Sequence, residues 1–158
     1  MADAYETPMP PMSPHIVVSD ATAAIDFYVR AFGAKELVRH MAPDGKRVMH
    51  CGLLLANGGM LMLSDDFPEY MGGVRRAPGP DSVPAVMLHL QVTDADSVYN
   101  QAVAAGATPT MPLMDMFWGD RYGKLRDPFH HEWSIGAAIR KVTEDEVNAA
   151  IKSFSAKS

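Results

Sequence analysis

Two stretches of the chain, 74 residues apart, repeat the same order of apolar and polar positions. The first reads HIVVSD at 15–20 and the second reads HLQVTD at 89–94. Each alternates with a period of two, as a half-buried strand does. Each ends in an Asp beside small residues, which is a signal for a helix N-cap. The pattern therefore predicts a strand followed by a helix in both halves of the chain.

The segments after these strands carry apolar residues at helical spacing. Both predicted helices stop at a glycine, Gly33 in the first half and Gly106 in the second, which is a common helix terminator. In each helix four residues share one face, which we expect to be buried: Ala24, Phe27, Tyr28 and Ala31 in the first, and Val98, Tyr99, Ala102 and Val103 in the second.

Strand patterns separated by turn residues follow each helix. A Pro- and Gly-rich stretch, 67–84, separates the halves, and Thr143 and Glu146 have the spacing of a capping box for a C-terminal helix. The predicted strands are 36–41, 48–56 and 60–64 in the first half, and 110–117, 122–126 and 131–138 in the second.

The order of elements is thus β-α-β-β-β, twice. We predict an α+β fold in which two tandem βαβββ modules form a curved mixed sheet around a shared concave cavity. The expected boundaries, within one functional domain, are 14–66 for module 1, 67–84 for the linker, 85–140 for module 2 and 141–158 for the C-terminal helix.

Composition narrows the function classes. The chain has 158 residues, a net charge of −5 and a pI near 5.6, which disfavours nucleic acid as a partner. No apolar stretch reaches the roughly 18 residues that span a bilayer, and no signal-peptide pattern occurs, so we expect a cytoplasmic protein without a membrane partner. The single cysteine, Cys51, lies in an apolar run and is interpreted as a buried small hydrophobic residue.

Three stretches resemble the vicinal oxygen chelate superfamily, which includes glyoxalase I, extradiol dioxygenases and bleomycin-resistance proteins. They are VSDATAAIDFYVRAFGA (18–34), HLQVTDADSVYNQAVAAGA (89–107) and MPLMDMFWGDRYGKLRDPFHHEWSIG (111–136), and the last is similar to the PhnB-like branch. The resemblance implies the paired-module fold. Together with apolar sheet edges in a short chain, it also predicts a homodimer.

Metal-using members of the superfamily hold a divalent ion at four strand positions. Carried over to this sequence, those positions are Ser13, Met62, Met87 and Ser134. Hydroxyl and thioether groups are poor ligands for Zn²⁺, Ni²⁺ or Fe²⁺. We therefore predict no cofactor at the usual site.

Three other residues keep a different possibility open. His15, His89 and Glu132 have the strand parity of the cavity face, and two histidines with a carboxylate can hold a divalent metal. They are the candidates for catalysis, either in such a shifted metal site or with a histidine as a metal-free general base. The alternative is that the histidines are hydrogen-bonded pocket or core residues.

The stretch 111–136 also supplies candidate ligand contacts. Aromatic, cationic and flexible apolar side chains suit a pocket for a small organic molecule. Three pairs are interpreted as structural or solvated: Arg126 with Asp127 in a turn, His130 with His131, and Asp65 with Asp66 at a strand end. The ligand-binding candidates are Met62, Met87, Trp118, Arg121, Tyr122 and Ser134.

The functional prediction is a PhnB-like protein that binds a small organic molecule in the inter-module cavity without the usual metal. The alternative is a metal-dependent lyase or dioxygenase that uses His15, His89 and Glu132. A third reading is a vestigial cavity in a protein whose role is assembly. Whether the protein is an enzyme stays open at this point.

Overall fold

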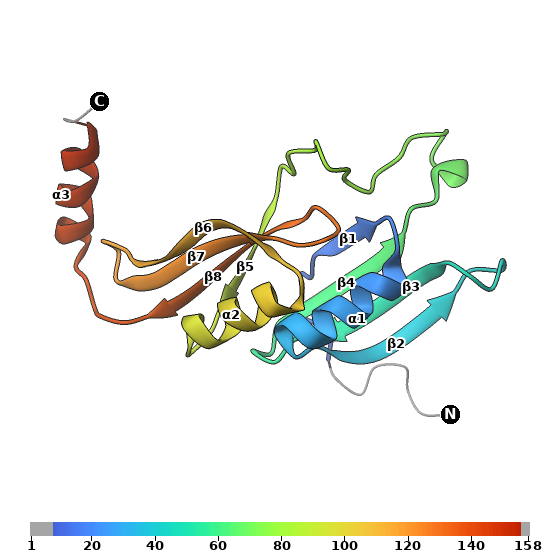
Figure 1. The fold of residues 1–158 in the computed structure, drawn as a ribbon, viewed down its shortest axis with the longest axis horizontal. Helices are drawn as coiled ribbons and strands as arrows, with labels where there is room; N and C mark the ends of the chain where they lie inside the picture. The colour runs from blue at the N-terminus through green and yellow to red at the C-terminus, as the bar shows by residue number, and fades with distance from the viewer. Residues whose placement is uncertain (1–7, 156–158) are drawn as a thin grey trace.

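The computed structural model describes residues 8–155 and contains two modules with the same order of elements (Figure 1). Module 1 comprises β1 (His15–Val18), α1 (Ala21–Phe32), β2 (Lys35–Met41), β3 (Val48–Leu54) and β4 (Met60–Asp65). Module 2 comprises β5 (Met87–Gln91), α2 (Ala95–Ala105), β6 (Thr108–Asp115), β7 (Asp120–Arg126) and β8 (Glu132–Ala138). The linker holds a single 3₁₀ turn, Pro68–Tyr70, and α3 (Glu144–Ser155) follows module 2.

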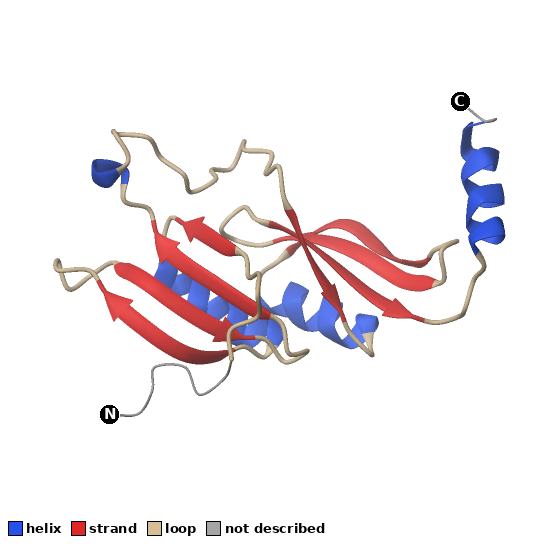
Figure 2. Cartoon of the chain, turned by 180° about the vertical axis from the view of Figure 1, so that it is seen from behind, coloured by secondary structure: helices blue, strands red, loops and turns tan. Residues whose placement is uncertain are grey.

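The α+β fold and the tandem βαβββ modules are confirmed. Each module forms a four-stranded mixed sheet, in the order β1-β4-β3-β2 and β5-β8-β7-β6. The first and last strands of each module pair in parallel, and the other pairs are antiparallel. Figure 2 shows the two sheets as separate groups of strands that lie side by side.

Side-chain hydrogen bonds connect the edge strands β1 and β5 to the opposite module. The Nε2 of His131 donates to the carbonyl oxygen of Val17 at 2.9 Å, and Asn57 Nδ2 donates to that of Gln91 at 3.2 Å. These bonds satisfy carbonyl groups at the sheet edges. The single curved sheet of the sequence prediction is therefore two sheets joined at their edges by side chains.

Helix capping follows the sequence signals. Asp20 accepts from the backbone N–H of Ala23, and Asp94 accepts from that of Ser97, each at 3.0 Å. Gly33 ends α1 with φ of 61°, a left-handed conformation that glycine adopts without strain. The two repeated strand–helix signals therefore predict these two helix starts correctly.

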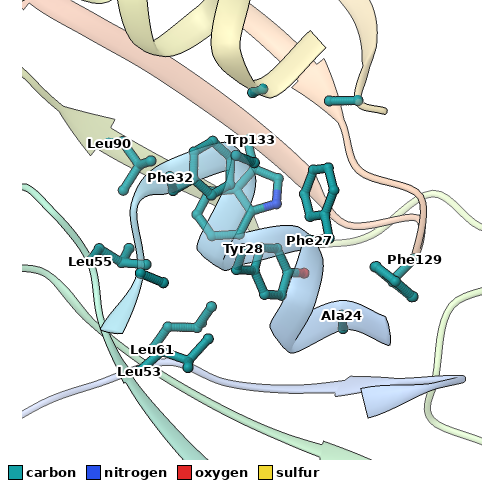
Figure 3. Packing of buried hydrophobic residues seen from close by; sticks show 14 of the residues in the cluster. Ala24, Phe27, Tyr28, Phe32, Leu53, Leu55, Leu61, Leu90, Phe129 and Trp133 are labelled. Atoms are coloured by element: carbon teal, nitrogen blue, oxygen red, sulfur yellow. The ribbon is translucent and has the colours of Figure 1, made fainter. Parts of the chain in front are cut away.

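One hydrophobic core joins the modules. α1 and α2 pack side by side, each covering one face of its own sheet (Figures 1 and 2). Trp133 of β8 reaches α1, with ring centroids 4.6 Å from Phe32 and 5.5 Å from Tyr28 (Figure 3). Cys51 is fully buried in this core, as predicted, and burial raises the pKa of its thiol to about 12. The helix-facing sides of both sheets are thus occupied, and their other faces are open.

The turn between β7 and β8 differs from the expected Arg–Asp pair. Asp127 is buried and its Oδ1 accepts from the backbone N–H groups of Phe129 and His131. Arg126 points elsewhere, because its Nη2 donates to the carbonyl oxygens of linker residues. These carbonyl groups belong to Gly79, Pro80 and Ser82.

The strand end at Asp65 also differs from the expected solvated pair. Asp65 is buried, and its two oxygens accept from the backbone N–H groups of Ala21 and Val48, at 2.8 and 2.6 Å. The interpretation of a solvated carboxylate is wrong for this residue, because it ties the starts of α1 and β3 to the end of β4.

The C-terminal helix is capped as predicted. The backbone N–H of Glu146 donates to Thr143 Oγ1, and the Thr143 N–H donates to Glu146 Oε2. α3 stands apart from the sheets, although the Phe154 ring contacts Phe117 at 5.5 Å (Figure 1). The last three residues of the predicted segment 141–158 lie outside the described residues. None of the helices within 8–155 is both long enough and apolar enough to span a membrane.

Candidate binding site between the two modules

His89 sits on the open face of the second sheet with both ring nitrogens engaged. Its Nε2 lies 2.9 Å from Oε1 of Gln91, and its Nδ1 lies 2.8 Å from Oγ of Ser134. An amide oxygen only accepts, so Nε2 carries the proton and Nδ1 accepts from the serine hydroxyl. The Tyr122 ring stacks on the imidazole with centroids 6.1 Å apart. The imidazole is therefore held in one tautomer and one orientation.

His15 occupies the matching place on the first sheet. Its Nε2 lies 3.3 Å from Oγ of Ser64, and its ring meets that of His50 edge-on at 5.9 Å. His50 in turn stacks on His40 at 6.1 Å, directly opposite it in the β2–β3 pair. Burial lowers the pKa of His15, and burial followed by repulsion from His15 and His40 lowers that of His50. The neutral forms of the His15 and His50 imidazoles are thus favoured.

A cavity of about 460 Å³ lies at the junction of the modules. The start of β1, the β3–β4 turn, β4 and β5 contribute its walls. Its apolar lining includes Met60, Leu61, Met87, Leu88, Leu90 and Trp133. Such a volume and a mainly apolar lining are typical of small-molecule sites.

A few polar groups line the same cavity. They include Ser13, Asn57 and His89. The Ser13 hydroxyl is buried and has no hydrogen-bond partner among the described residues. A buried hydroxyl without a partner is costly, and a bound polar group or water would relieve that cost.

The predicted ligand contacts are divided among different places. Met87 and His89 line the cavity. Met62 lies opposite His15 on the first sheet, outside the cavity lining, and Ser134 is only 2% exposed beneath His89.

The predicted aromatic contacts form a cluster beside the cavity lining. Trp118 packs edge-on against Tyr122, with ring centroids 5.4 Å apart, and Tyr122 in turn stacks on His89. The Tyr122 hydroxyl lies 4.0 Å from the sulfur of Met87. The aromatic pair therefore borders two residues that line the cavity.

Arg121 has a structural role in the described chain. Its Nε and Nη2 donate to the carboxylate of Asp96 at 2.9 Å, and its Nη1 donates to Asp115 at 3.2 Å. These bonds raise the pKa of Arg121. Because Asp96 is in the first turn of α2, Arg121 lies on the helix side of β7, away from the open face.

A divalent metal does not fit the residues present. Ser13, Met62, Met87 and Ser134, the positions implied by the resemblance, offer only hydroxyl and thioether groups. Among residues 8–155 no group of three or more His, Cys, Asp or Glu side chains could hold an ion.

The shifted set is not assembled within one chain. His15 belongs to the first sheet, whereas His89 and Glu132 belong to the second. Each histidine bonds a serine of its own sheet.

Several residues of the open faces were missed from sequence. His40 and His50 form a row with His15, and Gln91 fixes His89. Their signal was strand parity, since His89 and Gln91 are two positions apart on one strand and so share a face.

The comparisons with known proteins agree with the fold. A family model described as "Glyoxalase/Bleomycin resistance protein/Dioxygenase superfamily" matches residues 12–135. An uncharacterised protein of Mycobacterium bovis is 49% identical over 144 residues, which cover 91% of this chain and 93% of that protein. An uncharacterised protein of Mycobacterium tuberculosis has the same identity over the same share of this chain and 84% of its own length.

Solved structures show the same architecture. TioX from Micromonospora sp. ML1 superposes with a TM-score of 0.62 at 26% identity, covering 83% of this chain and 100% of its own. A PhnB protein from Bacillus cereus superposes with a TM-score of 0.60 at 18% identity, covering 82% and 100% of the two chains. At that identity the second likeness concerns the fold alone.

Proposed function

Since the chain belongs to the glyoxalase/bleomycin resistance protein/dioxygenase superfamily, we propose that it binds a small organic molecule between its modules without the superfamily's usual metal ion. The observation that carries this proposal is the cavity of about 460 Å³ with its apolar walls and the unpartnered Ser13 hydroxyl. Apolar walls supply most of the binding free energy, and a few polar groups orient the ligand.

The arrangement of His89 supports binding more than proton transfer. Both of its ring nitrogens are used within the protein, by Gln91 and Ser134. A general base needs a free nitrogen within hydrogen-bond reach of the substrate. His89 therefore serves as a fixed wall of the cavity, with Met87 as its flexible neighbour.

The proposal includes a homodimer. Each sheet is covered by a helix on one face only, and no helix or strand within residues 8–155 forms a second layer on the other face. Ile151 and Phe154 of α3 are also largely exposed, which favours contact with a second copy. Light scattering coupled to size-exclusion chromatography measures the mass, and a monomer at micromolar concentration would refute this part.

A filled cavity tests the binding proposal. Val86 lines the cavity and is 67% exposed, so Val86→Trp narrows the site with little effect on the core. Val83, 87% exposed in the same linker and outside the cavity lining, gives the matched control Val83→Trp. We expect 1-octanol, used as an apolar probe in calorimetric titration, to bind the unmodified protein and Val83→Trp but not Val86→Trp. Equal binding to all three proteins, or to none, would refute the proposal.

A further inference from the structure

A second cavity continues the first one along β1. It has a volume of about 450 Å³ and shares Pro14, Val86 and Leu88 with the first cavity. Its outer wall is the linker, which contributes Arg76 and prolines. The two cavities therefore form one groove, which we call the inter-module groove, between β1 on one side and β5 with the linker on the other.

Both ends of the inter-module groove are mainly apolar. The second end differs in that a cationic residue, Arg76, lines it together with His15 and His131. No Asp or Glu is among the residues that line this end.

The Arg76 guanidinium has no ion-pair partner within the described residues. Only the backbone N–H of Arg76 is bonded, to Oδ2 of Asp66 at 2.9 Å. Four arginines of the described chain form ion pairs instead, namely Arg39, Arg47, Arg121 and Arg140. A guanidinium that borders a cavity without a counter-ion can form two parallel hydrogen bonds with a carboxylate ligand.

The carboxylates near this end line an adjoining cavity. Asp65 and Asp66 line a smaller space that shares His15, Val17 and Arg76 with the groove. The oxygens of Asp65 accept backbone N–H groups, and Oδ2 of Asp66 accepts those of Arg76 and Ala77. Their charge disfavours an anion in that smaller space, so an anion bound by Arg76 is best placed on the groove side, whose lining contains no Asp or Glu.

The frame of this end is fixed before any ligand arrives. Arg126 holds the linker to β7, because its Nη2 donates to three carbonyl oxygens of the linker, the nearest at 2.8 Å. His131 donates from Nε2 to the Val17 carbonyl and so fixes β1 against module 2. A preformed site avoids the ordering cost that weakens binding by mobile loops.

We propose that the inter-module groove binds an amphipathic organic acid, with its carboxylate at Arg76 and its apolar part in the cavity beside Met87 and Trp133. The inference rests on the proposed function and adds the chemical class of the ligand. Arg76 supplies the charge, and His15 and His131 border the carboxylate as neighbouring polar groups.

A pair of probes that differ only in the head group tests this inference. Octanoate and 1-octanol have the same chain length, and calorimetric titration measures both. We expect octanoate to bind more tightly than 1-octanol. Arg76→Gln should lower the affinity for octanoate roughly tenfold or more, because it removes charge-assisted hydrogen bonds. It should leave the affinity for 1-octanol unchanged. Arg75→Gln is the matched control, since Arg75 is the adjacent exposed arginine but does not line this groove.

The outcomes separate the two proposals. In one outcome, 1-octanol binds the unmodified protein but not Val86→Trp, octanoate binds no more tightly than 1-octanol, and Arg76→Gln leaves the affinity for octanoate unchanged. The ligand class is then wrong and the binding function stands. If neither probe binds the unmodified protein, the binding function and the ligand class are both overturned. If Arg75→Gln and Arg76→Gln lower the affinity for octanoate equally, the effect is one of general surface charge. That outcome would also overturn the assignment of the carboxylate to Arg76.

Discussion

The Tyr28 hydroxyl donates to Oδ2 of Asp127 at 2.6 Å, and this buried bond joins the first helix of module 1 to the last turn of module 2. The same Oδ2 accepts from Trp133 Nε1 at 2.8 Å. Burial and the neighbouring carboxylate raise the pKa of Tyr28 well above its usual value. The bond therefore helps to set how the two modules, and hence the walls of the groove, sit against each other.

Removing this carboxylate should destabilise the protein strongly. Asp127→Ala leaves Tyr28, Trp133 and two backbone N–H groups without their acceptor, so we expect a loss of about 3–5 kcal/mol in the free energy of unfolding. Tyr28→Phe removes one donor only and should cost about 1 kcal/mol. Urea unfolding measures both, and equal losses for the two variants would contradict this ranking.

The histidine row should make stability fall in mild acid. The pKa values of His15 and His50 are lowered in the folded state, so these groups give stability above their unfolded pKa of about 6.5. That stability is lost as the pH falls through the lower folded values.

Urea unfolding at pH 8 and at pH 5 tests the histidine row. We expect a smaller loss between the two pH values in His50→Gln than in the unmodified protein. His130→Gln is a suitable control because His130 lies in the β7–β8 turn. The same pH dependence in both variants would show that His50 does not contribute.

Arg121→Gln should leave ligand binding unchanged. The side chain pairs with Asp96 and Asp115 at a partly exposed position, and such solvent-screened pairs contribute little to stability. Titration with 1-octanol and with octanoate, together with urea unfolding, measures both effects. A clear loss of affinity for octanoate would contradict this prediction and would support Arg121 as a ligand-binding residue.

Protein purified without chelators should contain no stoichiometric transition metal. The usual positions carry hydroxyl and thioether groups, and His15 and His89 are bonded to serines. Elemental analysis by plasma mass spectrometry measures the content. One equivalent of Zn, Ni, Mn or Fe per chain that disappears in His89→Ala would instead support the metal-dependent lyase or dioxygenase.

Local patterns made the modules predictable from sequence. The period of each strand and helix, the Asp N-caps and the capping box at Thr143 depend on residues a few positions apart. Asp20, Asp94 and Thr143 therefore act in the structure as their sequence neighbours indicate.

The groove was less predictable because it depends on contacts between distant residues. Tyr28 and Asp127 are 99 positions apart, and His131 and Val17 are 114 positions apart. No local period reports such pairs. One part was accessible: Arg121 and Tyr122 are adjacent on a strand and must point to opposite faces, so at most one of them could face a ligand.

The path of the linker is the remaining feature of the groove that differs from what the sequence predicts. Arg76 belongs to the linker that Arg126 anchors, whereas His131 reaches the groove from the β7–β8 turn. A Pro- and Gly-rich stretch has no periodicity from which such a path can be inferred. For the same reason the pairing expected for Arg126 with Asp127 was wrong.

The separation of α3 from the sheets has a practical consequence. In the described chain α3 packs against no other helix or strand, so within one copy it can fray and reform while the modules stay folded. Its amide protons should therefore exchange with deuterium far faster than those of β8, which immediately precedes it, except where the proposed homodimer covers them.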